Sequence, residues 1–336
     1  MHTKFPVENP SGFEVRQDRE PLQGETNLLR HKLPNGMEVA YQSKVELDHF
    51  YDDIFEKQVY LRHGIKLSEA DSVFDVGANI GLFTLFVCRN YKDVTVYSFE
   101  PAPPLFEILR ANASLYAPSA RLFNYGLSNE AKQAAFTFYP NSSGMSSFYG
   151  DEREEKEALR AIMCNQLRKG MDGMAEVMRY ADDVLDERFK HQTFTCRLET
   201  LSNTIREHHI ERIALLKIDV QKSELDVLLG IDEGDWEKIG QIVLEVHDLD
   251  GRLKLMLALL RSHGYQVTVE QDEMYEGSIL YNLYAIKPSH AVDSFAQQME
   301  RESAPQNRFQ QIRRRAEKQR TALRRQEQWM KERKKQ

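Results

Sequence analysis

From Ser72 onward, short apolar runs alternate with segments of helical periodicity. Seven runs have the length and composition of strands: 73–78, 94–101, 120–128, 213–220, 239–248, 265–272 and 280–288. Apolar residues recur at helical spacing between several of them, at 82–91, 104–116, 223–231 and 251–264. This alternation predicts an α/β fold with a parallel, doubly wound sheet. Only a short turn region separates the last two runs, so we expect an antiparallel hairpin at one edge.

Other patterns flank this core. Residues 28–44 predict a hairpin around an Asn35-Gly36 turn. Residues 46–63 carry apolar side chains at helical spacing and predict one helix leading into the core. Residues 1–27 are polar and rich in Pro and Gly, which is typical of a loose arm.

A charged, helix-forming segment at 151–190 interrupts the alternation and is interpreted as a helical cap insertion. Its four methionines could cover an apolar acyl chain, but methionine at helical spacing more often forms ordinary core; they are Met163, Met171, Met174 and Met178. We therefore divide the chain into an arm and hairpin at 1–45, a main domain at 46–290 and a basic helical tail at 291–336.

The composition fits this organisation. Of the 336 residues, 41% are hydrophobic and 29% are charged, which suffices for a sizeable core. No apolar run reaches the roughly 18 residues that span a bilayer, and the N-terminus lacks the pattern of a signal peptide. Three scattered cysteines without a CxxC pair indicate a reducing, cytoplasmic setting and no structural zinc site.

The net charge of −7 conceals an asymmetry, because residues 301–336 carry a net +9 and the remainder carries −16. An acidic body is a poor general binder of nucleic acid. The Arg-rich tail fits either a protein-docking helix or an RNA-binding segment. Its aromatic residues, such as Trp329, are few and not interleaved with the basic ones, and we favour protein docking.

The segment Val73–Gly81 indicates a ligand-binding turn. Asp75 comes near the end of the first parallel run, and Gly77 and Gly81 follow with GxxxG spacing. Dinucleotide sites instead use GxGxxG with a phosphate at the helix N-terminus. An acid at Asp75 would repel a pyrophosphate and could accept hydrogen bonds from an ammonium group, and Glu100, at the end of the next run, suits ribose hydroxyls. The alternative is a glycine turn that serves packing, with Asp75 as a helix cap.

Three motifs carry a family resemblance: DVGANIGLFTLF, FEPAPPLFEILRANA and LLKIDVQKSELDVLLGI. Together they resemble the FkbM family of class I methyltransferases over roughly residues 45–290. The segment EVHDLDGRL and the Arg-rich ending resemble the subgroup associated with polyketide and nonribosomal peptide assembly lines. The resemblance implies a Rossmann-like, seven-stranded sheet and S-adenosyl-L-methionine as cofactor.

The resemblance also implies roles for individual residues. Those expected to line the methionine part of the cofactor are Asp75, Gly77, Ala78, Asn79 and Gly81. The ribose is expected at Glu100 and Pro101, and the adenine against Gly126, Leu127 and Ser128. Asp219 is expected to face the methyl group or the acceptor.

One motif departs from the family. The family pattern after the fourth strand is D-x-E-G-x-E, whereas this chain reads Asp219-Val220-Gln221-Lys222-Ser223-Glu224. The first Glu and the Gly are replaced by Gln221 and Lys222. Any role of the missing Glu therefore does not transfer directly, and a different substrate is one explanation.

Methyl transfer to a hydroxyl needs an in-line approach and a base, and His247 is the preferred candidate because it ends the fifth strand at the expected ligand-binding rim. Glu224 or Glu245 would orient its imidazole. The alternatives are ordinary: His247 as a loop or helix cap, Asp219 as a helix N-cap, Glu224 as a first-turn acid and Lys217 as an inward salt-bridge partner.

The favoured function is therefore O-methylation of a free or carrier-bound polyketide or peptide intermediate. A second hypothesis is methylation of a sugar or another small metabolite, and a third is a non-catalytic binding module. Nucleic-acid N-methylation is disfavoured because DVQK stands where an Asn/Asp-Pro-Pro-aromatic loop would lie. A dehydrogenase is disfavoured by the acid at Asp75. The polar loop 139–147 is equally consistent with a substrate contact or a surface loop.

Overall fold

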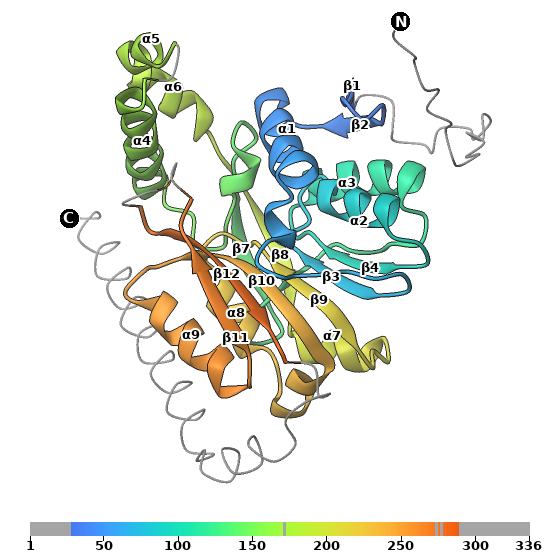
Figure 1. Ribbon diagram of the computed structural model, residues 1–336. Helices are drawn as coiled ribbons and strands as arrows, with labels where there is room; N and C mark the ends of the chain where they lie inside the picture. Colours follow the sequence, from blue (N-terminus) through green and yellow to red (C-terminus); the bar gives the residue numbers. More distant parts are fainter. Residues whose placement is uncertain (1–27, 171–172, 273–274, 276–277, 289–336) are drawn as a thin grey trace, which may run out of the picture.

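The computed structural model describes residues 28–170, 173–272, 275 and 278–288. Its main sheet has seven strands in the order β11-β12-β10-β9-β3-β4-β5 (Figure 1). They are β3 (Ser72–Val76), β4 (Thr95–Phe99), β5 (Arg121–Phe123), β9 (Ile213–Ile218), β10 (Ile239–His247), β11 (Gln266–Glu270) and β12 (Leu280–Ile286). The predicted doubly wound sheet is confirmed, and the antiparallel pair β11 and β12 forms one edge of it.

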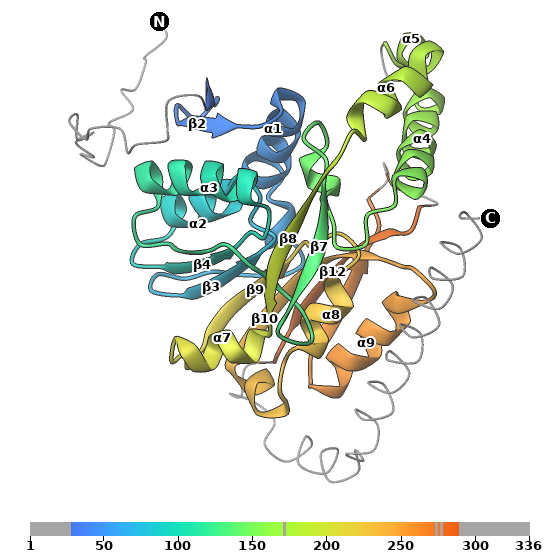
Figure 2. The same ribbon diagram turned by 180° about the vertical axis from the view of Figure 1, so that it is seen from behind.

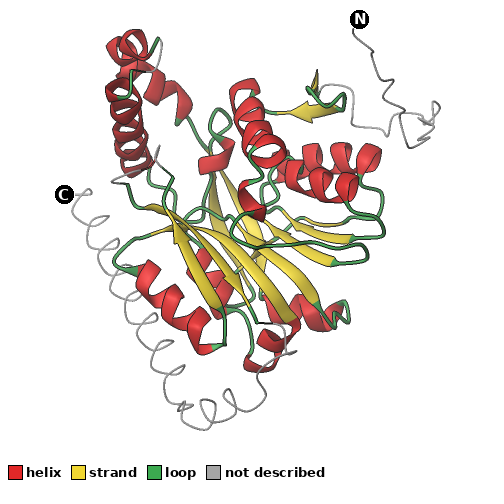
Figure 3. Ribbon diagram, in the orientation of Figure 1, coloured by secondary structure: helices red, strands yellow, loops and turns green. Residues whose placement is uncertain are grey.

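Helices cover both faces of this sheet (Figures 1 and 3). On one face lie α1 (Lys44–Tyr51), α2 (Leu82–Asn90) and α3 (Pro103–Tyr116). On the other lie α7 (Leu201–Glu207), α8 (Glu224–Leu229) and α9 (Arg252–Ser262), with a 3-10 turn, η5 (Glu233–Lys238), leading into β10. The layered arrangement leaves the carboxyl ends of the parallel strands open to carry a site.

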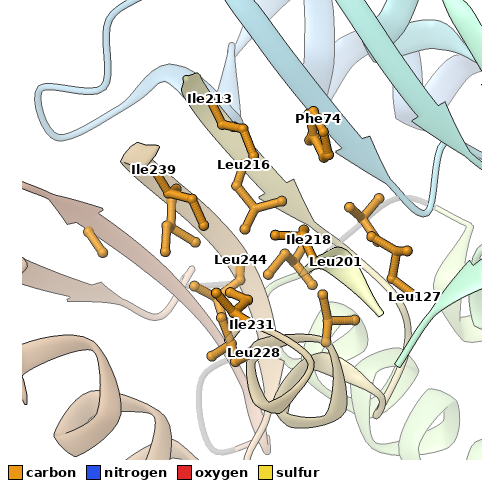
Figure 4. Packing of buried hydrophobic residues seen from close by; sticks show 14 of the residues in the cluster. Phe74, Leu127, Leu201, Ile213, Leu216, Ile218, Leu228, Ile231, Ile239 and Leu244 are labelled. Atoms are coloured by element: carbon orange, nitrogen blue, oxygen red, sulfur yellow. The ribbon is translucent and has the colours of Figure 1, made fainter. Parts of the chain in front are cut away.

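Two hydrophobic cores form because neighbouring residues of a strand point to opposite faces. Phe74, Leu216, Ile218 and Leu244 belong to the core beneath α7, α8 and α9 (Figure 4). Val73 belongs to the core beneath α1, α2 and α3. The central strands β3, β4, β9 and β10 are largely buried on both faces, which explains why they appear in the sequence as nearly continuous apolar runs.

A smaller sheet with the order β6-β8-β7 stands beside the main one (Figure 2). It contains β6 (Gly126–Leu127), β7 (Lys132–Phe138) and β8 (Gln192–Glu199). The predicted single strand at 120–128 was wrong in detail, because it divides into β5 of the main sheet and β6 of the smaller one. Where the chain passes from the main sheet to the smaller one, residues 124–128 run past the carboxyl end of β4.

The long connection between β7 and β8 holds a 3-10 turn, η3 (Ser143–Met145), and the α4–α6 segment, which projects beyond the sheets (Figures 1 and 2). This segment consists of α4 (Glu152–Arg168), α5 (Met174–Val177), η4 (Met178–Tyr180) and α6 (Ala181–Arg188). Met163, Met174 and Met178 pack with Tyr139 and Phe189 in a core of its own, as the ordinary interpretation predicted. Met171 lies outside the described residues.

The N-terminal hairpin forms as predicted from β1 (Leu29–Lys32) and β2 (Glu38–Tyr41), with Gly36 at a φ of 88°. The single helix predicted at 46–63 was wrong. Helix α1 passes into a π-helical turn, η1 (Asp52–Glu56), and Gln58, at a φ of 48°, then breaks the helix before the 3-10 turn η2 (Val59–Leu61). This break turns the chain toward the end of the sheet.

The predicted arm at 1–27 and the basic tail at 305–336 lie outside the described residues, and the division into three domains stays a prediction. In the described part of the chain, no helix combines the length and apolarity needed to cross a membrane. Within the same residues, no group of three or more His, Cys, Asp or Glu side chains is arranged to hold a metal ion.

Candidate active site

A cavity of about 820 Å³ lies at the carboxyl ends of β3, β4, β9 and β10 and extends beneath α4. Strands β4 and β9 flank β3 on opposite sides, so the chain reverses its winding direction at this point. Open α/β sheets bind ligands at such a switch point. The volume falls within the roughly 300–1,000 Å³ of small-molecule sites.

The turn after β3 forms one wall. Gly77, Ala78 and Asn79 line the cavity. Gly77 has a φ of 80°, and a Cβ there would lie 1.8 Å from the Asp219 carbonyl oxygen. The glycine therefore allows the turns after β3 and β9 to touch while it also lines the cavity, and its contact with the cofactor stays a prediction. Asn79 adopts a φ of 50° and donates from Nδ2 to Ser143 Oγ.

Gly81 is outside the lining of the cavity. It has a φ of 91°, and a Cβ would meet Leu109 Cδ1 at 2.6 Å. Its role in the structure is the close packing of α2 on α3. The expected contact of Gly81 with the methionine part of a cofactor stays a prediction.

Asp75 lies behind the cavity wall and is fully buried. Its Oδ1 accepts from Lys217 Nζ at 2.9 Å and its Oδ2 accepts from Thr84 Oγ1 at 2.8 Å. Burial alone would lower the pKa of Lys217, but the charges of Asp75, Asp219 and Glu100 and the hydrogen bond to Asp75 together outweigh it, and the pKa is raised. Asp75 thus holds a structural ion pair instead of facing a ligand ammonium group, and Lys217 is the inward salt-bridge partner that the sequence suggested.

Glu100 follows β4 and faces the cavity while only 4% exposed. Its carboxylate accepts from the backbone N–H groups of Asn79 and Ala102, both at 2.9 Å. Burial raises the pKa of Glu100 to about 7, against the effect of these hydrogen bonds. Each oxygen retains a lone pair, so this fixed carboxyl group can still accept hydrogen bonds from a ligand.

Two of the three residues expected against the adenine, Gly126 and Leu127, line the cavity, as does Pro101, which was expected at the ribose. Ser128 is buried outside the cavity lining and donates its backbone N–H to Glu199 O. The contacts of these residues with a cofactor stay predictions.

His247 ends β10 and lines the cavity, and its Nδ1 lies 3.2 Å from Glu224 Oε1. Glu224 begins α8 and lies beneath the wall, fully buried. Burial alone would lower the pKa of His247, but the hydrogen bond and charge of Glu224 raise it above its ordinary value. With Nδ1 engaged by Glu224, Nε2 is the nitrogen that remains for an acceptor.

Asp219 and Glu245 line the cavity beside His247. Gln221 Nε2 lies 3.3 Å from an oxygen of each and bridges them. Burial and the charge of Asp219 raise the pKa of Glu245 to about 8, so this group is protonated at neutral pH. The replacement of a family Glu by Gln221 thus puts a neutral donor between two acids.

Several lining residues were absent from the sequence prediction. Tyr60 donates to Asp219 Oδ2 at 2.8 Å, and Glu46 accepts from the backbone N–H groups of Ser143 and Gly144. The first turns of α4 also line the cavity, including Glu154, Glu155, Ala158 and Leu159. No local motif marks these residues, because the break after α1 and the fold of the connection between β7 and β8 bring them to the cavity.

Comparison with known proteins agrees with this arrangement. The family model described as the methyltransferase FkbM domain matches residues 75–267. The chain belongs to the FkbM methyltransferase family. It is therefore a methyltransferase, and the predicted enzyme class is confirmed.

Two relatives are about 40% identical to the chain over the aligned residues. The 31-O-demethyl-FK506 methyltransferase FkbM of Streptomyces tacrolimicus is 42% identical over 254 residues, covering 76% of this chain and 95% of that protein. The AMB antimetabolite synthetase AmbE of Pseudomonas aeruginosa is 40% identical over 279 residues, covering 81% of this chain but 13% of the synthetase. The chain thus spans a small part of AmbE and nearly all of the Streptomyces methyltransferase.

A solved structure of an FkbM methyltransferase from Methylobacillus flagellatus KT is 12% identical, with a TM-score of 0.41 over 70% of this chain and 47% of that one. The fold assignment therefore rests on the strand order described above.

Proposed function

We propose that this methyltransferase uses S-adenosyl-L-methionine to methylate a hydroxyl group, with His247 as the general base. The observation that carries the proposal is the His247–Glu224 pair, which lies in the same cavity as the Asn79–Glu100 wall. A base oriented by a buried carboxylate is the arrangement that deprotonates a weakly acidic hydroxyl.

The cavity suits this cofactor. Glu100 offers its fixed carboxyl group for ribose hydroxyls, Leu127 offers an apolar surface for the adenine, and Gly77 to Asn79 offer backbone for the methionine portion. The carboxylate of Asp219, which lines the cavity, favours a cationic ligand. When bound, S-adenosyl-L-methionine supplies an electrophilic methyl carbon.

The side chains then hold the acceptor and remove its proton. The acceptor oxygen would lie against His247 Nε2, and its proton would pass to that nitrogen as the oxygen–methyl bond forms and the methyl–sulfur bond breaks, with the electron pair left on sulfur. Glu224 stabilises the positive imidazole through Nδ1 at 3.2 Å. Glu245, whose pKa is raised to about 8, lines the cavity beside this pair and accepts from Gln221. Asp219, held by Tyr60 and Gln221, fixes the wall beside the reacting atoms.

The acceptor enters beneath the α4–α6 segment, which we propose acts as a cap. Apolar side chains of α4, including Leu159 and Ile162, line that end of the cavity. This lining suits a hydrophobic natural-product intermediate, in keeping with the names of the FkbM and AmbE relatives. The acceptor can be free or carrier-bound, and a sugar hydroxyl is less well matched to an apolar wall.

The test is methyl transfer by the purified chain to 31-O-demethyl-FK506 and to carrier-bound hydroxyacyl and peptidyl thioesters, followed by mass spectrometry. We expect His247→Ala to reduce kcat by about 10²- to 10⁴-fold, the usual contribution of general-base catalysis. Calorimetry should show unchanged binding of S-adenosyl-L-methionine. Full activity of His247→Ala would eliminate the base, and no binding of the cofactor would sink the proposal.

A further inference from the structure

Lys222 has an unusual backbone conformation at the edge of the proposed active site. Its φ is 72°, a left-handed conformation that a residue with a Cβ rarely adopts, and Gln221 before it has a φ of 44°. Glycine would adopt this conformation freely, and the FkbM pattern has glycine at this position. A lysine here therefore requires contacts that hold it.

The backbone of Lys222 contacts both neighbouring helices. Its N–H donates to Glu224 Oε1 at 2.8 Å, the same oxygen that lies 3.2 Å from His247 Nδ1. Its carbonyl accepts from Arg252 Nη1 at 2.7 Å. The left-handed turn thus directs a donor at the carboxylate that orients the proposed base.

The side chain of Lys222 crosses to α4. Its Nζ lies 2.6 Å from Glu155 Oε1 and 3.4 Å from Glu154 Oε2. Both Lys222 and Glu155 are only 5% exposed, so this is a buried ion pair between the α4–α6 segment and the loop after β9. Removing one charge would leave the other buried without its partner, which is strongly unfavourable.

We propose that Lys222 is a positioning residue that couples docking of the α4–α6 segment to alignment of the His247–Glu224 pair. This inference rests on the proposed function for its catalytic consequence. With Glu155 docked, the ion pair holds Lys222 in its left-handed conformation and its N–H on Glu224. When α4 moves away, the ion pair is lost and the backbone relaxes, so Glu224 loses a hydrogen-bond donor and no longer fixes the imidazole.

Two substitutions at Lys222 separate its contributions. Lys222→Met removes the charge but keeps the Cβ, so the backbone should leave the left-handed conformation. Lys222→Gly also removes the charge, but it adopts a φ of 72° without strain and should keep the N–H on Glu224. Glu155→Gln removes the partner on α4 while leaving Glu154 within 3.4 Å of Nζ, so its effect should be smaller. Asp182→Asn is the matched control, since it breaks an exposed ion pair with Arg160 inside the α4–α6 segment.

The first readout is an NMR titration of the His247 imidazole in the full chain, assigned by comparison with His247→Ala. It needs no acceptor. The groups that act on this imidazole are Glu224, Glu245 and Lys222 itself. Removing the positive Lys222 charge directly would raise the pKa of His247, whereas misalignment of Glu224 would lower it. We expect Lys222→Met and Glu155→Gln to lower it, and Lys222→Gly and Asp182→Asn to give no decrease.

The second readout is steady-state kinetics. We expect Lys222→Met to reduce kcat by about 10- to 100-fold, the loss typical of removing a partner that orients a functional group. Binding of S-adenosyl-L-methionine should be unchanged. A pKa of His247 that does not fall in Lys222→Met and Glu155→Gln, or an equal fall in Asp182→Asn, would overturn the coupling. If Lys222→Met does not fold, Glu155→Gln decides. The titration does not depend on transfer activity. It can therefore support the coupling even if His247 is not the base, and it can contradict the coupling even if His247 is the base.

Discussion

Replacing Glu224 by Gln tests the electrostatic role of the carboxylate beside His247. The substitution keeps the shape of the side chain, and its carbonyl oxygen can still accept from Lys222 N–H and from His247 Nδ1. It removes the negative charge that stabilises the protonated imidazole. The geometry therefore changes little while the electrostatics change greatly.

The expected magnitude follows from the hydrogen bond. A hydrogen bond to a charged group contributes about 1.5–3 kcal/mol, and the pair is buried, with Glu224 fully inaccessible. Each 1.36 kcal/mol changes a rate about tenfold. Because the imidazole becomes charged as it takes the proton, Glu224→Gln should lower kcat by roughly 10- to 150-fold.

The pH dependence gives a second measure. His247 must be neutral to accept a proton, so the rate should rise with pH as its imidazole deprotonates. Because Glu224 raises the pKa of His247 above the ordinary 6.5, the acid limb of kcat/KM should lie above that pH. Without the carboxylate the pKa should fall and the limb should move to lower pH.

The assay is the initial rate of methyl transfer between pH 5 and 9, with calorimetry of cofactor binding for each variant. Glu233→Gln is the matched control, because it makes the same change in another Glu–His pair. Glu233 is exposed, lies 3.8 Å from His263 and is away from the cavity. Equal acid limbs in wild type and Glu224→Gln would refute the assignment of the carboxylate, even if the rate fell.

Two further predictions concern stability. Lys217→Met should destabilise the protein by about 3–5 kcal/mol in urea unfolding, because it leaves Asp75 buried without its counter-ion. Adding Asp75→Asn to this variant should restore part of the lost stability. A loss below about 1 kcal/mol in Lys217→Met alone would contradict a structural ion pair. The folded-state pKa of Glu245 is raised to about 8, so its contribution is fully present below its ordinary pKa of 4.5 and is lost as pH rises through about 8. The free energy of unfolding should therefore be a few kcal/mol lower at pH 8.5 than at pH 5.5, and this difference should be smaller in Glu245→Gln. An unchanged difference in the variant would exclude Glu245 as its source.

The sheet was predictable because its central strands, β3, β4, β9 and β10, are largely buried on both faces and appear as apolar runs. The smaller sheet was not, because β8 alternates polar and apolar residues and pairs with β7 across a connection of 53 residues. The break after η1 was also missed, since Phe50 to Val59 keep helical spacing while Gln58 leaves the helix.

The site was predictable where chemistry lies at strand ends. Glu100, Asp219, Glu245 and His247 all line the cavity, as their positions in the sequence indicated. Contacts between distant segments carry no such signal. Lys222 and Glu155 are 67 residues apart, and neither belongs to a periodic pattern that would pair them.

The buried Asp75–Lys217 pair also changes the argument about which ligand the cavity selects. From the sequence, we expected the negative charge of Asp75 to repel a pyrophosphate. In the structure, Lys217 neutralises the charge of Asp75 behind the cavity wall. Discrimination must then come from side chains that face the cavity. Glu100 contacts the glycine turn directly, because its carboxyl group accepts from the N–H of Asn79, one of the donors that a phosphate at this turn would need. The occupied donor and the adjacent carboxyl group together oppose a phosphate, so Glu100 supports the proposed preference for a phosphate-free nucleoside.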